Sequence, residues 1–218
     1  MFSKRFFERS CGLLAAMVAA ILSSAAQAVP DAQLQIALSQ FSMAQTGDSA
    51  AIERAAQVFQ ALLRSEPSNP LLMAYAGAST TMKARTTWLP WEKMSYADDG
   101  LFLLDKALTQ LRPEHHAAPQ NSTPAVLEVR FVASNVFLAV PGFMNRRARG
   151  ARLLNEVLSN PLLARSPLSF QGTVWLRAAD LAEDEKRLSD ARRFLKQVID
   201  NNAPQAAAAR ARLRALAS

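Results

Sequence analysis

The stretch that decides the fold is residues 55–79, AAQVFQALLRSEPSNPLLMAYAGAS. Its first part places large and small apolar residues on one helical face and ends at a proline, at offsets of 0, 4, 7 and 12: Ala55, Phe59, Leu62 and Pro67. Asn69 and Pro70 then provide the cap and first residue of a second helix. Gly77 in that helix favours a close crossing with a further helix. The stretch therefore predicts tightly packed successive helices.

A second stretch with the same pattern lies near the C-terminus, at residues 174–200, VWLRAADLAEDEKRLSDARRFLKQVID. Trp175, Ala178, Ala179 and Ala182 share one helical face, and Ala191, Leu195 and Val198 follow at the spacing of a second helix. Trp175 takes the large position and Ala179 the small one. We therefore expect Trp175 to be a core residue.

These offsets resemble those of the tetratricopeptide-repeat family over most of residues 31–217, with a weaker unit at residues 101–113, LFLLDKALTQLRP. Residues 77–151 also resemble an uncharacterised group of bacterial tetratricopeptide-like proteins. The shared words are GAST, KAR, LPWEKMSYADDGL, DKAL, VRF and PGFMNRR. The chain departs from that group at residues 112–124, RPEHHAAPQNSTP, where its loop is longer. The resemblance implies a fold and brings no mechanism.

The implied fold is all-α, with antiparallel helix pairs stacked as a tetratricopeptide-like superhelix of about nine helices in one domain, residues 29–218. Composition agrees, because 50% of the 218 residues are hydrophobic, only 7% are aromatic and glycine is scarce. Periodicity and capping residues predict helices at Asp31–Gln45, from a cap at Asp48 or Ser49 to Ser65, from Pro70, at Trp91–Leu111, Pro124–Leu138 and Asn145–Ser159, and three times after Pro167. The last has an apolar stripe suited to capping an array: Ala206, Ala209, Leu213 and Leu216.

The N-terminus predicts export. Basic residues precede the apolar run CGLLAAMVAAIL, residues 11–22, and a small-x-small end follows at residues 26–28. We expect a signal peptide over residues 1–28, cleavage after Ala28, and a periplasmic or secreted mature protein. The alternative is an inner-membrane anchor formed by residues 11–28, since no charge occurs between Ser10 and Pro30.

Charge and cysteine content limit the chemistry. Removal of residues 1–28 would lower the net charge from +7 to +5, and it would remove Cys11, the one cysteine. The mature chain would then have no disulfide, no catalytic thiolate and no cysteine-bound metal. A basic exported protein meets anionic lipid, glycan or an acidic protein face before it meets nucleic acid, so we expect no nucleic-acid partner.

No catalytic or cofactor motif stands out. His115 and His116 are adjacent in a predicted loop, a poor arrangement for a metal site, and Asp98-Asp99 precedes a glycine, which favours a turn or helix end over an acid pair. The sequence has no glycine-rich phosphate loop and no nucleophile elbow. We therefore expect a non-enzyme without cofactor or metal, with an enzyme of unknown type as the least favoured hypothesis.

Two of the three tryptophans lie in residues 86–100, TTWLPWEKMSYADDG. The favoured interpretation is a structural clasp that buries Trp88 and Trp91 between helices, because indoles bury large areas. The alternative is an exposed binding groove, whose candidate partner-binding residues are Arg85, Trp88, Trp91, Lys93 and Tyr96.

A basic run, MNRRARGARLLNE, spans residues 144–156. Arg146, Arg149 and Arg152 recur every three residues along a predicted helix, whose start is unfavourable for cations. The run indicates either an anionic partner or a solvated face with pairs such as Arg152–Glu156.

The first functional hypothesis is an exported interaction protein that presents a concave helical face to a protein or peptide. The second is a peripheral envelope protein that binds anionic lipid or glycan through the basic helix face.

Overall fold

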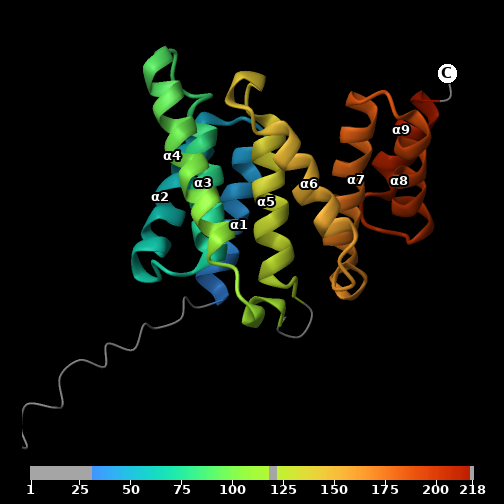
Figure 1. Ribbon diagram of the computed structural model, residues 1–218, viewed down its shortest axis with the longest axis horizontal. Coiled ribbons are helices and arrows are strands. Elements are labelled where there is room, and N and C mark those ends of the chain that lie inside the picture. Colours follow the sequence, from blue (N-terminus) through green and yellow to red (C-terminus); the bar gives the residue numbers. More distant parts are fainter. Residues whose placement is uncertain (1–30, 118–121, 217–218) are drawn as a thin grey trace, which may run out of the picture.

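The computed structural model describes residues 31–117 and 122–216, and within these residues all regular structure is helical (Figure 1). The α-helices are α1 (Asp31–Gln45), α2 (Ser49–Ser65), α3 (Pro70–Lys83), α4 (Pro90–Thr109), α5 (Ala125–Ala139), α6 (Arg147–Leu158), α7 (Leu168–Asp184), α8 (Leu188–Asp200) and α9 (Ala206–Ala215). Three short 3-10 helices are η1 (Pro113–His116), η2 (Gly142–Met144) and η3 (Leu163–Arg165). The all-α prediction is confirmed. The expected signal peptide, residues 1–28, lies outside the described residues.

Local sequence sets where the helices begin. The Asp48 side chain accepts a hydrogen bond from the Ala51 N–H at 2.8 Å and caps α2. Asn69 Oδ1 accepts from the first N–H groups of α3, and Pro70 occupies the first turn. Both caps satisfy N–H groups that have no partner inside the helix. Of the two caps predicted for α2, the structure uses Asp48, and the predicted end of α2 at Ser65 is confirmed. The predicted range of α1, Asp31–Gln45, is also confirmed.

The predicted start of the sixth helix is wrong by two residues. Asn145 adopts a left-handed backbone conformation with φ of 53°, so α6 begins only at Arg147. Asparagine tolerates this conformation better than most residues do. The preceding Pro141 and Gly142 form the turn that leads into η2.

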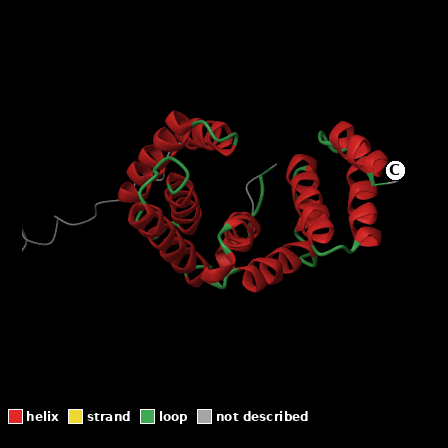
Figure 2. Ribbon diagram, turned by 90° about the horizontal axis from the view of Figure 1, so that it is seen from above, coloured by secondary structure: helices red, strands yellow, loops and turns green. Residues whose placement is uncertain are grey.

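Consecutive helices pack as antiparallel pairs, α1 with α2, α3 with α4, α5 with α6 and α7 with α8, and α9 covers α8. Contacts between neighbouring pairs run from α2 to α3, from α3 and α4 to α5, and from α6 to α7, and the contact between α2 and α3 is the most extensive of these. Seen from above, the helices follow a curved path that is open on one side (Figure 2). The structure is thus a bent row of helix pairs.

The closest crossing is the one between α3 and α4, at two glycines. A Cβ atom added at Gly100 would lie 2.5 Å from the carbonyl oxygen of Gly77 and 2.1 Å from Oγ1 of Thr81. A Cβ atom added at Gly77 would lie 2.7 Å from the carbonyl oxygen of Gly100. The role predicted for Gly77, a small residue at a close helix crossing, is confirmed.

The core residues predicted for the C-terminal end of the row are also buried or partly buried in the structure. Trp175 is 9% exposed and packs with Ala179 of α7 and Leu195 of α8. The predicted stripe of α9 closes the same cluster through residues that are buried or partly buried: Ala206, Ala209, Leu213 and Leu216.

We predict that Gly100→Ala destabilises the protein by roughly 1–3 kcal/mol, because the new methyl group overpacks a backbone contact. This cost outweighs the gain of about 1 kcal/mol that alanine has over glycine in a helix. The matched control is Gly142→Ala, where a Cβ atom meets nothing within 4 Å, and it should change stability by less than about 0.5 kcal/mol. Urea unfolding of both variants measures the difference, and equal stabilities would contradict the crossing argument.

Candidate functional site: a concave groove and a projecting helix end

The main cavity of the described chain is an open groove of about 1410 Å³. Its walls come from the first helix of each pair, α1, α3, α5 and α7, together with the beginning of α4 and with η2. The second helices α2, α6 and α8 lie on the outer side of the row and contribute no lining residue from the described part of the chain. We call this cavity the concave groove.

The wall formed by α1 and α3 is aromatic and aliphatic. The rings of Phe41 and Tyr75 meet edge to face with centroids 4.9 Å apart, and the Tyr75 ring stacks on Phe59 at 5.0 Å. Such pairs fix ring positions as well as burying area. Leu38 and Met82 extend the same apolar wall. This side of the groove suits an apolar ligand surface.

A single carboxyl group interrupts the apolar wall. The Tyr75 hydroxyl donates a hydrogen bond to Glu128 Oε1 at 2.5 Å, which links α3 to α5. Burial raises the pKa of Glu128, although the hydrogen bond from Tyr75 opposes this effect. The pKa of Tyr75 is raised well above its ordinary value by burial, by the charge of Glu128 and by their hydrogen bond. Both effects favour neutral forms of this pair.

Two polar atoms in the groove lining are buried and have no hydrogen-bond partner among the described residues. They are Asn135 Oδ1 on α5, an acceptor, and Arg177 Nε on α7, a donor. Gln205 Oε1 is also unpaired, but it packs against α7, since a Cβ atom at Gly172 would lie 2.3 Å from it. Unpaired buried polar atoms are costly, and a rotation of these two side chains toward the groove would let a ligand satisfy the donor and the acceptor.

The candidate residues of the 86–100 stretch divide between the groove and the solvent. Arg85 and Lys93 are exposed and line the groove. Trp88 is 82% exposed and Trp91 is 68% exposed. Tyr96 is partly buried, and Lys83 Nζ lies 4.7 Å from the centre of its ring.

The predicted clasp is therefore wrong. Helix α4 has 20 residues and its partner α3 has 14, so the beginning of α4 extends beyond α3. None of residues 90–96 is buried, and the first buried residue of α4 is Ala97. No helix of the described chain covers the two indoles. We call residues 85–96 the projecting tip.

The three arginines of the predicted basic face also lie in different environments. Arg146 Nη1 lies 3.0 Å from Asp105 Oδ2, and Arg149 pairs with the other oxygen of Asp105. Both guanidinium groups lie over the Phe137 ring, at 5.5 and 5.2 Å from its centre. These two arginines therefore join α6 to α4 and α5. Arg152 is exposed and apart from that cluster.

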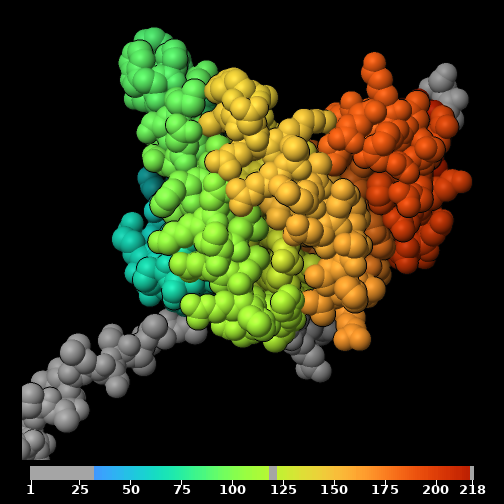
Figure 3. All heavy atoms as spheres, viewed as in Figure 1, coloured from blue at the N-terminus to red at the C-terminus, as the bar shows by residue number. Residues whose placement is uncertain are grey.

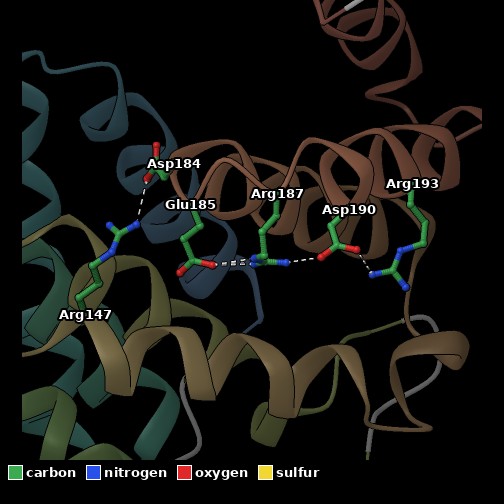
Figure 4. A network of polar contacts seen from close by, with 6 residues as sticks. All are labelled: Arg147, Asp184, Glu185, Arg187, Asp190 and Arg193. Atoms are coloured by element: carbon green, nitrogen blue, oxygen red, sulfur yellow. Dashed lines mark hydrogen bonds and ion pairs between the residues drawn. The ribbon is translucent and has the colours of Figure 1, made fainter.

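The expected pair of Arg152 with Glu156 is not formed, because Glu156 Oε2 lies 3.2 Å from Arg130 Nε. Neighbouring charges pair across helices in the same way. Figure 4 shows Arg147 beside Asp184 at the end of α7 and Arg187 between two carboxylates at the beginning of α8. Most of the basic surface around α6 to α8 is thus matched by carboxylates.

The remaining candidates have local roles. His115 Nδ1 accepts a hydrogen bond from the Arg112 N–H at 2.8 Å and caps η1. The prediction of a turn or helix end at Asp98-Asp99 is wrong, because both residues lie inside α4 and are exposed. Over the residues that the structure describes, no three His, Cys, Asp or Glu side chains are grouped to hold a metal. Among the same residues, no helix has the length and apolar character needed to cross a bilayer.

Comparisons with protein-family models, curated proteins and solved structures found no match to this chain. The fold and the groove define an all-α protein of stacked helix pairs with a ligand-accessible inner face.

Trp91→Ala should change the free energy of unfolding by less than about 0.5 kcal/mol, because its indole is already in water. Trp175→Ala should cost roughly 3–5 kcal/mol, because it leaves a cavity in the core between α7 and α8. Thermal unfolding of both variants beside the parent protein checks the difference. A large loss for Trp91→Ala would restore the clasp interpretation.

The Glu128→Gln variant should gain stability relative to the parent protein as the pH rises. The raised pKa keeps Glu128 protonated in the folded state over a pH range in which the unfolded chain has already ionised. The parent protein therefore loses stability from about pH 4 upward, where an unfolded glutamate ionises. Glutamine keeps an acceptor for Tyr75 and cannot ionise. Melting temperatures at pH 4 and pH 7 measure this, and a difference that does not grow with pH would contradict it.

Proposed function

We propose that this protein is an exported, non-enzymatic, tetratricopeptide-like adaptor that binds a protein or peptide segment in its concave groove. The observation that carries the proposal is the pairing of an apolar wall with two unpaired polar atoms, Asn135 Oδ1 and Arg177 Nε. An apolar wall binds side chains, and a donor with an acceptor matches the carbonyl and N–H groups of a peptide.

The size of the groove supports a polymer over a small molecule. Pockets for small ligands have volumes of roughly 300–1,000 Å³ and enclose most of the ligand. The concave groove is larger, at about 1410 Å³, and it is open, with lining residues from α1, α3, α4, α5 and α7. A peptide segment fills such a shape with successive side chains.

Charge at the groove supports the same proposal. Arg85 and Lys93 lie at the end beside the projecting tip, and Arg177 lies on α7. Asp180 is close to Arg177, at 3.9 Å, but its other oxygen is held by Arg212 at 2.6 Å. The lining thus has three cations, Arg85, Lys93 and Arg177, against the carboxyl groups of Asp180 and Glu128, and burial raises the pKa of Glu128. This small excess of positive charge favours a segment with acidic residues at its polar positions.

The alternative function, binding of anionic lipid or glycan by the face of Arg146, Arg149 and Arg152, has less support. Asp105 pairs with two of these arginines, and both lie against the Phe137 ring. An arginine that is committed to an internal carboxylate offers little to an external phosphate.

We predict that peptides selected by the purified protein from a displayed random library bind the groove. Ala139 lines the groove on α5 and is exposed, so Ala139→Glu should weaken the selected peptides at least about tenfold by adding bulk and negative charge. Ala148→Glu is the matched control, since Ala148 is an exposed helical alanine of α6 outside the groove. Fluorescence anisotropy measures both affinities.

Asn135→Leu and Arg177→Met test the polar atoms directly. Each should cost the selected peptides roughly tenfold in affinity, because one hydrogen bond to the ligand is lost. The proposal fails if no peptide is enriched, or if the groove variants and the Ala148 control bind alike.

A further inference from the structure

The projecting tip carries a compact set of exposed apolar side chains, and its two tryptophans lie outside the lining of the concave groove. Trp88, Trp91 and Met94 are 82%, 68% and 40% exposed, and they fall within seven residues of one another. Single exposed apolar residues are common on protein surfaces, but a cluster with two indoles is a sign of an interaction surface. Tryptophan in particular favours boundaries between apolar and aqueous phases.

The loop that presents the indoles is held by hydrogen bonds. Thr87 Oγ1 donates to Glu92 Oε2 at 2.5 Å, and the Leu89 N–H donates to Thr87 Oγ1 at 3.2 Å. Thr86 Oγ1 donates to the carbonyl oxygen of Lys83 at 2.9 Å. The tip therefore needs little ordering when it binds, and binding costs less conformational entropy. The hydrogen bond from Thr87 also engages the carboxylate of Glu92.

A second projection lies at the same end of the molecule. Helix η2, between α5 and α6, carries Phe143, which is 67% exposed. The beginning of α4 and η2 both rise above the body of the protein in Figures 1 and 3. Met94 and Phe143 both line the concave groove, so the two projections lie at one end of it.

The charges at this end are mainly positive. Arg85 and Lys93 are exposed within the projecting tip, and neither forms an ion pair with a described residue of the kind that holds Arg146 and Arg149. Glu92 is the one carboxylate among residues 85–96 and is partly buried, and the next ones along α4, Asp98 and Asp99, begin about two turns beyond Trp91, roughly 10 Å along the axis. Exposed aromatic rings with cations beside them match the headgroup region of an anionic bilayer.

We propose that the projecting tip docks on an anionic lipid surface, with the indoles of Trp88 and Trp91 in the headgroup region and Arg85 and Lys93 at lipid phosphates. A flat, deformable surface accommodates two separate projections at once, whereas a protein partner would need a matching hollow for each. Docking in this orientation places one end of the concave groove at the membrane surface. The surface is distinct from the face of Arg146, Arg149 and Arg152.

The test uses the full chain with vesicles of 30% phosphatidylglycerol in phosphatidylcholine and vesicles of phosphatidylcholine alone, in the absence of peptide. Tryptophan emission should shift to shorter wavelength with the anionic vesicles and be quenched by brominated acyl chains. In the double variant Trp88→Ala and Trp91→Ala, only the buried Trp175 emits, so neither change should occur. This readout reports the tip itself, whatever residues 1–30 contribute to vesicle binding.

Phe102→Ala is the matched control, because Phe102 is 67% exposed on α4 but lies eleven residues beyond Trp91. It should show the same emission shift as the parent protein. Arg85→Gln combined with Lys93→Gln should reduce the preference for anionic over neutral vesicles at least about tenfold. Emission of the parent protein that is unaffected by vesicles would overturn the proposal, as would loss of selected-peptide binding in the double tryptophan variant, which would assign the tip to a protein or peptide partner.

Discussion

The rest of the structure depends on the contact between the backbones of α3 and α4 at Gly77 and Gly100. Two helices approach this closely only where neither has a side chain, and the approach is tight enough that one added methyl group meets a carbonyl oxygen at 2.5 Å. The pair then presents one continuous surface to α5, and the first hydrophobic cluster runs from α1 through α3 and α4 into α5 and α6. A similar close helix crossing, with one glycine, occurs where Gly150 of α6 contacts Phe137 and Leu138 of α5.

Helix α5 connects the two halves of the molecule, and it does so because it is apolar on most of its circumference. Val129 and Phe137 belong to the cluster shared with α3 and α4, while Leu127 and Phe131 belong to the cluster shared with α6 and α7. A helix that is buried on two sides leaves only a narrow strip for other uses. That strip faces the concave groove and holds Glu128 and Asn135. The polar residues of the candidate site thus lie on the strip of α5 that its packing against other helices leaves uncovered.

Whether a charged or aromatic side chain is available to a partner likewise depends on whether a neighbouring helix covers it. Arg146 and Arg149 are close to a carboxylate and a ring, so they serve the packing of α6 against α4 and α5. The projecting tip is the opposite case, because α4 is six residues longer than α3 and its first turns have no neighbour to cover them. Its indoles and cations are left for an external partner. The concave groove and the projecting tip share four residues, Arg85, Pro90, Lys93 and Met94.

The sequence by itself determined the class of fold, the capped starts of α2 and α3 and the core role of Trp175, because capping and periodicity act within one helix or between adjacent ones. It also singled out the segment that became the projecting tip. Only the tertiary structure decided that Trp88 and Trp91 are exposed, since burial depends on whether a neighbouring helix is long enough to cover them. The same holds for the pairing of Tyr75 with Glu128, whose positions are 53 residues apart, and for the buried Arg177 Nε, which has no hydrogen-bond partner among the described residues. Periodicity shows which face of a helix is apolar, but the groove arises from the curvature of the whole row, which no local pattern specifies.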